Sequence, residues 1–400
     1  MAIHVKNNFC IAPFTQLTFS PQGNYSPCAE IGGRPWKDNA ASPVSMWTSE
    51  EFNQLRNDFL SNTRSKICTR CWDQELDNNQ SLRKRLLTQG TDKFQKGELI
   101  PYLENQYQVG PKQINIMVGN KCNLRCRICN AGCSVTYNTE GTIYEKSLGI
   151  KTVYTDANKK QIELTPIQID EIIKISGNLQ RIEFYGGEPL LDHPTLELLN
   201  KLVSSERSQH ITLFYNTNGT VAPSQRHYNL WSKFKTVEFN FSIDDIDDRY
   251  TYMRHPAIWS DLVDNINEIK SHTPQIQMSF NAISTISAIN VYYLPELLDR
   301  LVEMNLKTFI NTLHGPEYYE ITHLPIPVKL QIKEKLLQYH DLNKIQFIIN
   351  MLSGPDTKEQ WEWFKKFTKV KDNYRKESFE RVMPEYYQIL YEYDNSFANV

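Results

Sequence analysis

Short stretches in which apolar residues alternate with polar residues, or run together, recur along the middle of the chain. Six of them read as β-strands, and they cover Ile114–Val118, Arg181–Tyr185, Ile211–Tyr215, Val237–Ile243, Ile276–Phe280 and Lys307–Asn311. Between them lie segments with helical spacing of apolar positions, such as Ile167–Ile175 and Leu262–Ile269. Strands that alternate with helices predict βα units and a parallel sheet. We therefore expect an α/β fold, a partial (β/α)6 TIM-like barrel, over residues 106–315.

The two flanks have different patterns. Residues 1–105 read as a small, loop-rich unit, with a turn at Pro21–Asn24 between short strands and a capping box at Thr48–Glu51 that begins a helix. On a later helix of this unit we interpret Arg83 as part of a solvated face. Residues 316–400 are mostly helical in pattern, and we expect their aromatic side chains to be core; these are Trp361, Trp363, Phe364 and Phe367. The sequence thus predicts a small N-terminal cysteine-rich domain (1–105), a barrel (106–315) and a helical C-terminal segment (316–400).

Composition narrows the class of protein without revealing its chemistry. The chain has 400 residues and a formal net charge of −2, so the totals give no sign of nucleic-acid or anionic-membrane binding. The first residues lack the apolar stretch of a signal peptide, and no apolar run approaches membrane-spanning length. We expect a soluble, cytoplasmic protein.

The eight cysteines form two groups, and none lies beyond position 133. The groups are Cys10, Cys28, Cys68 and Cys71, then Cys122, Cys126, Cys129 and Cys133. An even number permits a disulfide framework, but a long chain without a secretory signal does not favour one. Cysteine pairs separated by two residues inside such a chain are more typical of metal binding.

The second group follows the first predicted strand. Cys122, Cys126 and Cys129 have spacings of three and two residues. An iron–sulfur cluster held by three cysteines leaves its fourth iron open to a small molecule. The carboxyl end of a strand is also where α/β barrels keep their chemistry. Cys133 extends the spacing loosely toward that of a ferredoxin, so a closed, four-cysteine cluster stays the alternative.

The second predicted strand ends in Tyr185-Gly186-Gly187-Glu188-Pro189. Two glycines allow a ligand to approach the backbone closely, and Glu188 offers a carboxylate at the mouth of the barrel. Such a turn is weak evidence alone, since strands often end in glycine. It gains weight because it comes one βα unit after the three-cysteine loop.

Together these motifs resemble the radical S-adenosylmethionine (SAM) superfamily over roughly residues 112–315. The resemblance implies a 4Fe–4S cluster on Cys122, Cys126 and Cys129. It also implies contact between the amino group of SAM and the glycine-rich turn, which consists of Gly186, Gly187, Glu188 and Pro189. Ile128 departs from the pattern, because the residue before the third cysteine is usually aromatic in that family.

Four further positions agree with that family. Asn218 lies in a turn like the family's Thr-Asn-Gly turn after the third strand. Ser242 and Asp244 end the fourth strand, where a polar side chain typically meets the SAM ribose. Arg254 resembles an arginine that pairs with the SAM carboxylate, a bidentate use suited to guanidinium. The alternative for each is an ordinary loop or surface residue.

The N-terminal cysteines are similar to those of a SPASM or twitch domain. That resemblance rests on Cys10, Pro13-Phe14, the Pro21-Gln22-Gly23 turn, Cys28, Met46-Trp47-Thr48 and the pair Cys68 and Cys71. It implies one fully ligated auxiliary 4Fe–4S cluster, with a zinc site as the alternative because both use four cysteines. Such a domain normally follows the barrel, whereas here it precedes it.

The resemblance implies an enzyme that cleaves SAM reductively and abstracts hydrogen from a peptide or peptide-like substrate, giving epimerisation, cross-linking or oxidation. It implies a low-potential electron donor of the flavodoxin or ferredoxin type. Two alternatives stay open: a small-metabolite substrate such as a sugar or amino acid, and a non-catalytic electron carrier with closed clusters. Cys133 is either an idle thiol or a catalytic hydrogen-atom donor that quenches a substrate radical.

Overall fold

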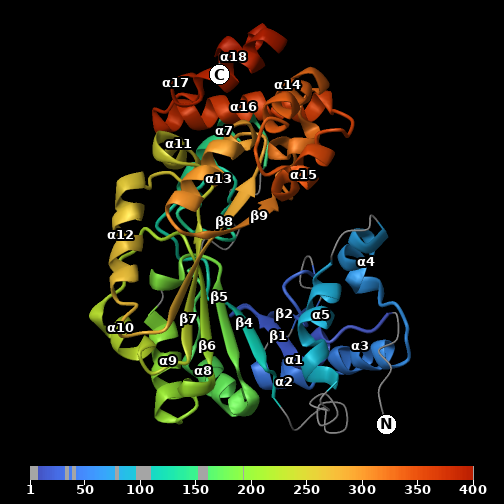
Figure 1. Ribbon diagram of the computed structural model, residues 1–400, viewed down its shortest axis with the longest axis vertical. Coiled ribbons are helices and arrows are strands. Elements are labelled where there is room, and N and C mark those ends of the chain that lie inside the picture. Colours follow the sequence, from blue (N-terminus) through green and yellow to red (C-terminus); the bar gives the residue numbers. More distant parts are fainter. Residues whose placement is uncertain are drawn as a thin grey trace.

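A single mixed sheet runs through the computed structural model (Figure 1), which describes residues 8–31, 36–37, 42–76, 81–95, 110–151, 161–191 and 193–399. The strand order is β3-β2-β1-β4-β5-β6-β7-β8-β9. The strands are β1 (Gln16–Phe19), β2 (Asn24–Ser26), β3 (Trp36–Lys37), β4 (Gln113–Met117), β5 (Arg181–Tyr185), β6 (Thr212–Thr217), β7 (Thr236–Ser242), β8 (Met278–Ile286) and β9 (Lys307–Thr312). Strands β4 to β9 are parallel, as the sequence predicts.

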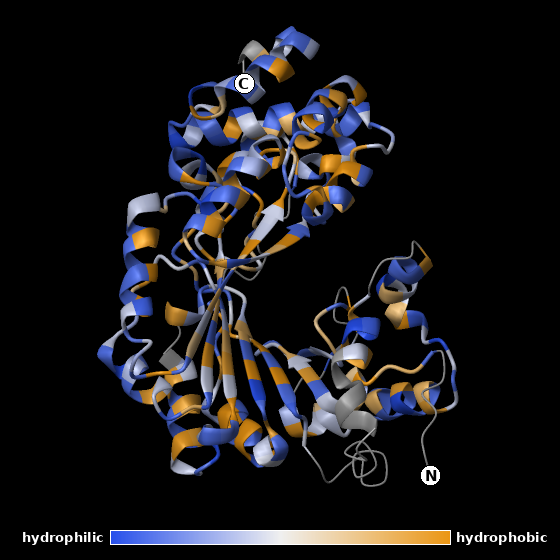
Figure 2. Ribbon diagram, in the orientation of Figure 1, coloured by the Kyte–Doolittle hydropathy of each residue, from blue (hydrophilic) through white to orange (hydrophobic). Residues whose placement is uncertain are grey.

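Helices connect the parallel strands as crossovers. They are α7 (Tyr137–Leu148), α8 (Pro166–Lys174), α9 (His193–Ser204), α10 (Gln225–Trp231), α11 (Asp247–Met253), α12 (Trp259–Ser271) and α13 (Leu294–Glu303). In Figure 1, α8, α9, α10 and α12 cover one face of the sheet. Apolar and polar residues alternate along most of β5 (Figure 2), and each second residue of β5 and β6 is buried. This alternation is what a sheet with one covered face requires.

The N-terminal residues extend the same sheet. The predicted hairpin forms, with Phe19 opposite Tyr25, and β1 then pairs in parallel with β4. The helices here are α1 (Ala12–Thr15), α2 (Pro43–Trp47), α3 (Glu50–Leu60), α4 (Thr69–Leu76) and α5 (Leu82–Gln95). The predicted helix forms, but the predicted capping box does not: Ser49 rather than Thr48 caps α3, through the amide of Phe52. The Thr48 hydroxyl, at the end of α2, instead donates to the carbonyl oxygen of Val44. The boundary at residue 105 stays a prediction, although the sheet crosses it.

The C-terminal residues form a helical layer at the other end of the sheet (Figure 1). Its helices are α14 (Ile326–Leu336), α15 (Leu342–Met351), α16 (Lys358–Arg375), α17 (Phe379–Val382) and α18 (Pro384–Tyr393). Trp361, Phe364 and Phe367 are buried in this layer and Trp363 packs against it, as expected. None of the helices in the described part of the chain combines the length and the apolar character needed to cross a bilayer.

Candidate functional site

The three-cysteine motif lies on residues 120–136, which we call the cysteine loop. This loop leaves the carboxyl end of β4 and ends where α7 begins. Because β4 to β7 are parallel, the segments that follow β5, β6 and β7 reach the same edge of the sheet. The structure therefore gathers the predicted site residues of four separate strand ends.

Side chains from two of these segments approach the sulfur atoms of the loop. Asn218 Nδ2 lies 3.9 Å from Cys122 Sγ, and Arg254 Nη1 lies 3.8 Å from Cys126 Sγ. Burial, with the neighbouring Cys126 sulfur second, raises the pKa of the Cys122 thiol to about 12. Burial likewise raises the pKa of the Cys126 thiol, partly opposed by Arg254. Loading of metal onto these thiols must therefore release protons, because thiolate is the ligand form.

The two glycines after β5 allow the strand ends to meet. Gly186 and Gly187 have φ angles of +79° and +54°, a region that favours glycine. A Cβ atom on Gly187 would lie 2.5 Å from the carbonyl oxygen of Lys121, in the cysteine loop. The amide of Glu188 donates to that same oxygen at 2.8 Å. The glycine-rich turn therefore packs directly against the backbone of the cysteine loop.

The Glu188 carboxylate is turned into the protein, whereas the sequence predicted that it lies at the mouth of the barrel. It is 1% exposed, and it accepts hydrogen bonds from Thr217 Oγ1 at 2.7 Å and from the amides of Asn218 at 2.7 Å and Leu190 at 3.0 Å. Burial raises the pKa of Glu188, and these hydrogen bonds oppose that rise. Its carboxylate therefore fixes the turn after β6, while its backbone belongs to the glycine-rich turn.

Arg254 stands between the end of β7 and the cysteine loop. Its Nη2 atom pairs with Asp244 Oδ2 at 2.8 Å, and Asp244 also accepts from the amide of Thr285 at 2.8 Å. Its Nε atom is buried and has no hydrogen-bond partner among the described residues. A buried guanidinium with an unused donor fits an anionic ligand beside Cys126. The pairing of Arg254 with a SAM carboxylate, and the contacts of Ser242 with its ribose, stay predictions.

Cys133 lies close to the third cysteine of the motif. A hydrogen bond with the Cys133 side chain, followed by burial, raises the pKa of the Cys129 thiol well above its ordinary value. The amide of Cys133 donates to the carbonyl oxygen of Asn130 at 3.2 Å. A fourth sulfur therefore adjoins the motif, and its role stays a prediction.

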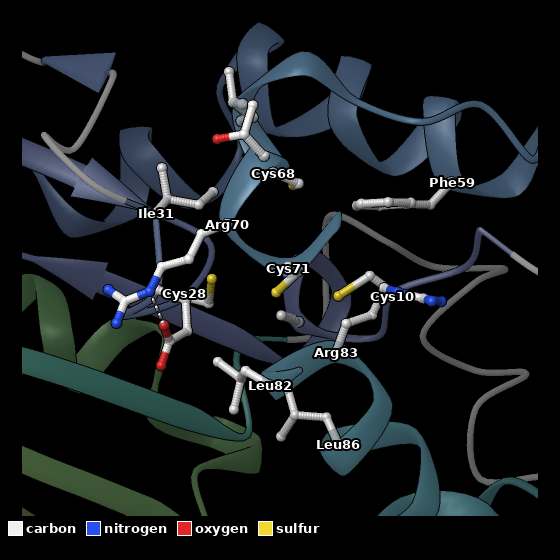
Figure 3. Close-up of a pocket in the computed structure, with 14 residues that line it drawn as sticks. Cys10, Cys28, Ile31, Phe59, Cys68, Arg70, Cys71, Leu82, Arg83 and Leu86 are labelled. Carbon is white, nitrogen blue, oxygen red and sulfur yellow. Dashed lines mark ion pairs between the residues drawn. The ribbon is translucent and has the colours of Figure 1, made fainter. Parts of the chain in front are cut away.

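The N-terminal cysteine set, Cys10, Cys28, Cys68 and Cys71, lines a cavity of about 220 Å³. Figure 3 shows the four side chains around it; Cys68 and Cys71 come from one helical segment, and Cys10 and Cys28 come from two others. Burial raises the pKa values of these thiols, and the proximity of the other sulfurs adds to the effect at Cys10. Four cysteines can hold either an iron–sulfur cluster or a zinc ion, so the nature of the group in this cavity stays a prediction.

Two ion pairs adjoin this cavity. Arg70 pairs with Glu30 at 3.0 Å across its rim. Arg83 is 6% exposed; it pairs with Glu75 and donates to the carbonyl oxygen of Phe9 at 2.9 Å. The expectation that Arg83 lies on a solvated face was wrong, because its helix turns this side chain toward the cysteines and the local pattern of charges does not reveal that orientation.

Within the described ranges, no three Cys, His, Asp or Glu side chains are close enough to hold a single metal ion.

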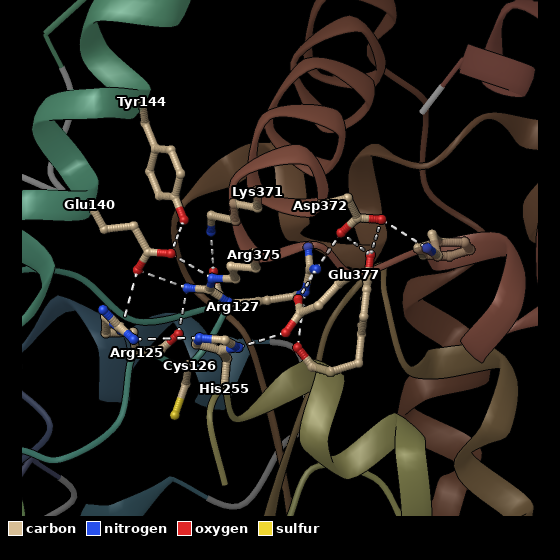
Figure 4. Close-up of polar contacts among 12 residues, drawn as sticks. Arg125, Cys126, Arg127, Glu140, Tyr144, His255, Lys371, Asp372, Arg375 and Glu377 are labelled. Carbon is tan, nitrogen blue, oxygen red and sulfur yellow. Dashed lines mark hydrogen bonds and ion pairs between the residues drawn. The ribbon is translucent and has the colours of Figure 1, made fainter.

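Sequence reasoning missed a group of buried charges behind the cysteine loop (Figure 4). Arg127, within the motif, pairs with Asp372 and Glu377, and Arg375 pairs with Glu140. These pairs join residues 235 to 250 positions apart, so no local spacing marks them. The one available signal is that Lys371 and Arg375 continue the apolar face of α16 that carries Phe364 and Phe367.

Comparison with known proteins agrees with this geometry. Residues 116–281 match the Radical SAM superfamily. This part of the chain is a radical SAM domain. The radical SAM cyclopropyl synthase TigE of Paramaledivibacter caminithermalis is 29% identical over 140 residues, which are 35% of this chain and 29% of TigE. The chain therefore spans less than a third of that relative.

Some solved structures also resemble this chain in part. Native anSMEcpe with bound AdoMet has a TM-score of 0.42 and 16% identity, over 60% of this chain and 62% of that one. Streptococcus suis SuiB bound to the precursor peptide SuiA has a TM-score of 0.38 and 13% identity, over 64% of this chain and 52% of that one.

Proposed function

We propose that the chain is a radical SAM enzyme whose 4Fe–4S cluster is held by Cys122, Cys126 and Cys129 at the carboxyl edge of a partial barrel. The observation that carries the proposal is the close fit between the cysteine loop and the turn at Gly186 and Gly187. A cluster with a small anionic ligand fits this site, which offers three sulfurs, the glycine-rich turn and the unused Nε donor of Arg254. When bound, such a cluster supplies the electron that cleaves SAM to methionine and a 5′-deoxyadenosyl radical, which abstracts hydrogen from the substrate.

The residues of this chain have distinct parts in that reaction. The backbone of Gly186, Gly187 and Pro189 faces the amino end of SAM, and Glu188 holds the neighbouring turn with Asn218 in place. Arg254 offers positive charge beside Cys126. Ser242 and Asp244, at the end of β7, lie where the ribose binds. The sheet and the flanking helices exclude water from the radical.

The proposed substrate is a peptide or peptide-like molecule. Support comes from the N-terminal cysteine set, which resembles the auxiliary-cluster domain of peptide-modifying enzymes and lines a cavity of about 220 Å³. Cys10, Cys28, Cys68 and Cys71 would hold an auxiliary 4Fe–4S cluster, which could supply an electron acceptor for a net oxidation or cross-link. The relative TigE is named a cyclopropyl synthase, which adds ring closure to the outcomes to examine. A small precursor-peptide gene beside this gene would favour a peptide; genes of sugar or nucleotide metabolism would favour a metabolite.

Anaerobic reconstitution tests this proposal directly. After iron and sulfide are counted, SAM and dithionite are added and 5′-deoxyadenosine is measured by mass spectrometry. We expect about eight irons per chain, four for each cluster, together with 5′-deoxyadenosine. Cys126→Ala should abolish its formation, and iron-loaded wild-type protein that never forms it would contradict the proposal.

A second variant separates the enzyme from an electron carrier. The contact between Cys133 and Cys129 is the observation that favours a closed, four-cysteine cluster. In the enzyme, Cys133→Ala keeps the full iron content and the SAM-dependent change in the cluster spectrum. In a carrier, the same variant loses about half of the iron, and SAM leaves the wild-type spectrum unchanged.

A further inference from the structure

Three successive carbonyl oxygens of the cysteine loop are held by side chains from other segments. The oxygen of Arg125 accepts from Arg375 Nη2 at 2.6 Å, and the oxygen of Arg127 accepts from Lys371 Nζ at 2.6 Å. Between them, the oxygen of Cys126 accepts from the Tyr137 hydroxyl. Residues 120–136 contain no helix or strand of their own. These external donors therefore act together with hydrogen bonds inside the loop to fix its path.

Two of the three donors belong to α16, far away in the chain. Lys371 is 0% exposed, and the side chain of Arg375 is fully buried against Glu140 at 2.6 Å. Lysine and arginine are rarely buried completely, because removing their charge from water is costly. Here α16 brings both side chains to the back of the same short loop (Figure 4).

The motif itself reaches back to the same end of α16. Arg127 pairs with Asp372 and with Glu377 Oε2, the latter at 2.5 Å. Its Nε atom donates to the carbonyl oxygen of Tyr252 at 2.9 Å, and its amide donates to that of Met253 at 2.8 Å. Both the main chain and the side chain between the second and third cysteines are thus fixed by distant residues.

We propose that the end of α16 is part of the iron–sulfur site, with Lys371 and Arg375 as positioning residues that preset the cysteine loop for its cluster. This inference rests on the proposed function. The two side chains donate to the carbonyl oxygens of Arg125 and Arg127, on either side of Cys126, rather than to the sulfurs themselves. They act by orienting the backbone that carries the three cysteines, so the site is completed by a segment outside the radical SAM domain.

Thiol labelling of the metal-free protein tests the inference without any cluster or activity. Lys371→Met removes the bond to the carbonyl oxygen of Arg127, and Lys369→Met is the matched control, because Lys369 is exposed two residues earlier on the same helix. Labelling with N-ethylmaleimide is followed at each cysteine by mass spectrometry. We expect Lys371→Met to speed labelling of Cys122, Cys126 and Cys129 about tenfold, the order of effect of losing one buried hydrogen bond. The N-terminal cysteine set in the same sample should keep its wild-type rate.

Iron content provides the second readout. After reconstitution, we expect Lys371→Met to hold about four irons per chain where wild type and Lys369→Met hold about eight. Wild-type labelling rates and wild-type iron in a folded Lys371→Met protein would overturn the inference, even if its unfolding temperature fell. If wild type itself holds no cluster on the loop, the proposed function fails, while the labelling comparison still decides the inference.

A milder variant covers the case in which Lys371→Met does not fold. Arg375→Lys keeps a cation facing Glu140, but it lacks the forked guanidinium that reaches both Glu140 and the carbonyl oxygen of Arg125. We expect faster labelling of Cys122 and Cys126 in this variant. If the ion pair alone mattered, the rates would match wild type, and this result would overturn the positioning role of Arg375.

Discussion

Two glycines with similar backbone angles differ in what surrounds them. Gly187, in the turn after β5, has φ of +54° and lies against the backbone of Lys121. Gly149, which follows α7, has φ of +68° and has no atom near the position of an added Cβ. The first glycine therefore serves both conformation and close approach, and the second serves conformation only.

Alanine substitution separates these two requirements. Gly149→Ala should lower the free energy of unfolding by about 1 kcal/mol, the cost of a left-handed alanine. Gly187→Ala should lower it by about 2–4 kcal/mol, because its Cβ also collides with a backbone oxygen. Urea unfolding of the metal-free proteins measures both values. Equal decreases in the free energy of unfolding would show that the turn can move away from Lys121 to accommodate the Cβ atom, and would contradict the prediction.

At the scale of single residues, local chemistry was predictable and distant chemistry was not. The cysteine spacing and the Gly-Gly-Glu-Pro turn are contiguous in sequence, so their meaning could be read directly. The inward orientation of Glu188 depends on its bonds to Thr217 and Asn218, which belong to another strand end. The place of Lys371 depends on tertiary packing over 244 residues. Neither orientation follows from neighbouring residues in the sequence.

Among the elements, α16 is joined to the segment after α18 by one carboxylate. Asp394 accepts from Lys365 Nζ at 2.6 Å and from Trp361 Nε1 at 2.9 Å. Burial alone would raise the pKa of Asp394, but these bonds and those from Ser396 outweigh it and hold that pKa well below its ordinary value. The stabilisation is therefore complete above the unfolded pKa of about 3.9 and is lost as pH falls below it.

Asp394→Asn should lower the free energy of unfolding at pH 7 by about 1–2 kcal/mol, toward the low end because the carboxylate is partly exposed. The difference from wild type should shrink below about pH 4, where the wild-type carboxylate begins to lose its advantage. Urea unfolding at pH 7, 5 and 3.5 measures this trend. A difference that stays constant across this range would contradict the ionic contribution.

The strands were predicted well because alternation of apolar residues is a direct signal of a half-buried sheet. Their ends were less certain. We expected the fifth parallel strand at Ile276–Phe280, whereas β8 covers Met278–Ile286. The extension arises because β8 pairs with β7 on one side and with β9 on the other, as at Ile283 and Thr285. Pairing on both sides prolongs a strand beyond its own local pattern.

At the scale of the molecule, one sheet carries both cysteine groups. Strand β1 covers the edge of β4, and Asn115 donates to Thr18 Oγ1 at 2.8 Å within the buried contact. Leu17 and Phe19 of β1 belong to the same apolar core as Ile114 and Ile116 of β4. The N-terminal residues are thus part of the folding unit that contains the radical SAM domain.

Removal of residues 1–105 should therefore damage the rest of the chain. The edge of β4 would become an unpaired strand beside exposed core residues, an arrangement that promotes aggregation. We expect the shortened chain to bind the dye 1-anilinonaphthalene-8-sulfonate and to scatter light, whereas the full chain does neither. A shortened protein that stays monomeric and unfolds cooperatively would show that the two parts fold independently.

The bond between Lys371 and the cysteine loop also has a consequence in time. A chain grows from its N-terminus at about 5–20 residues per second, so Lys371 is added roughly 10–50 s after Arg127. During that interval the three cysteines have been translated, but the helix that orients their backbone has not. Iron delivered to the nascent chain would meet thiols without a fixed arrangement. If the loop takes up metal, we therefore expect this to follow the synthesis of α16.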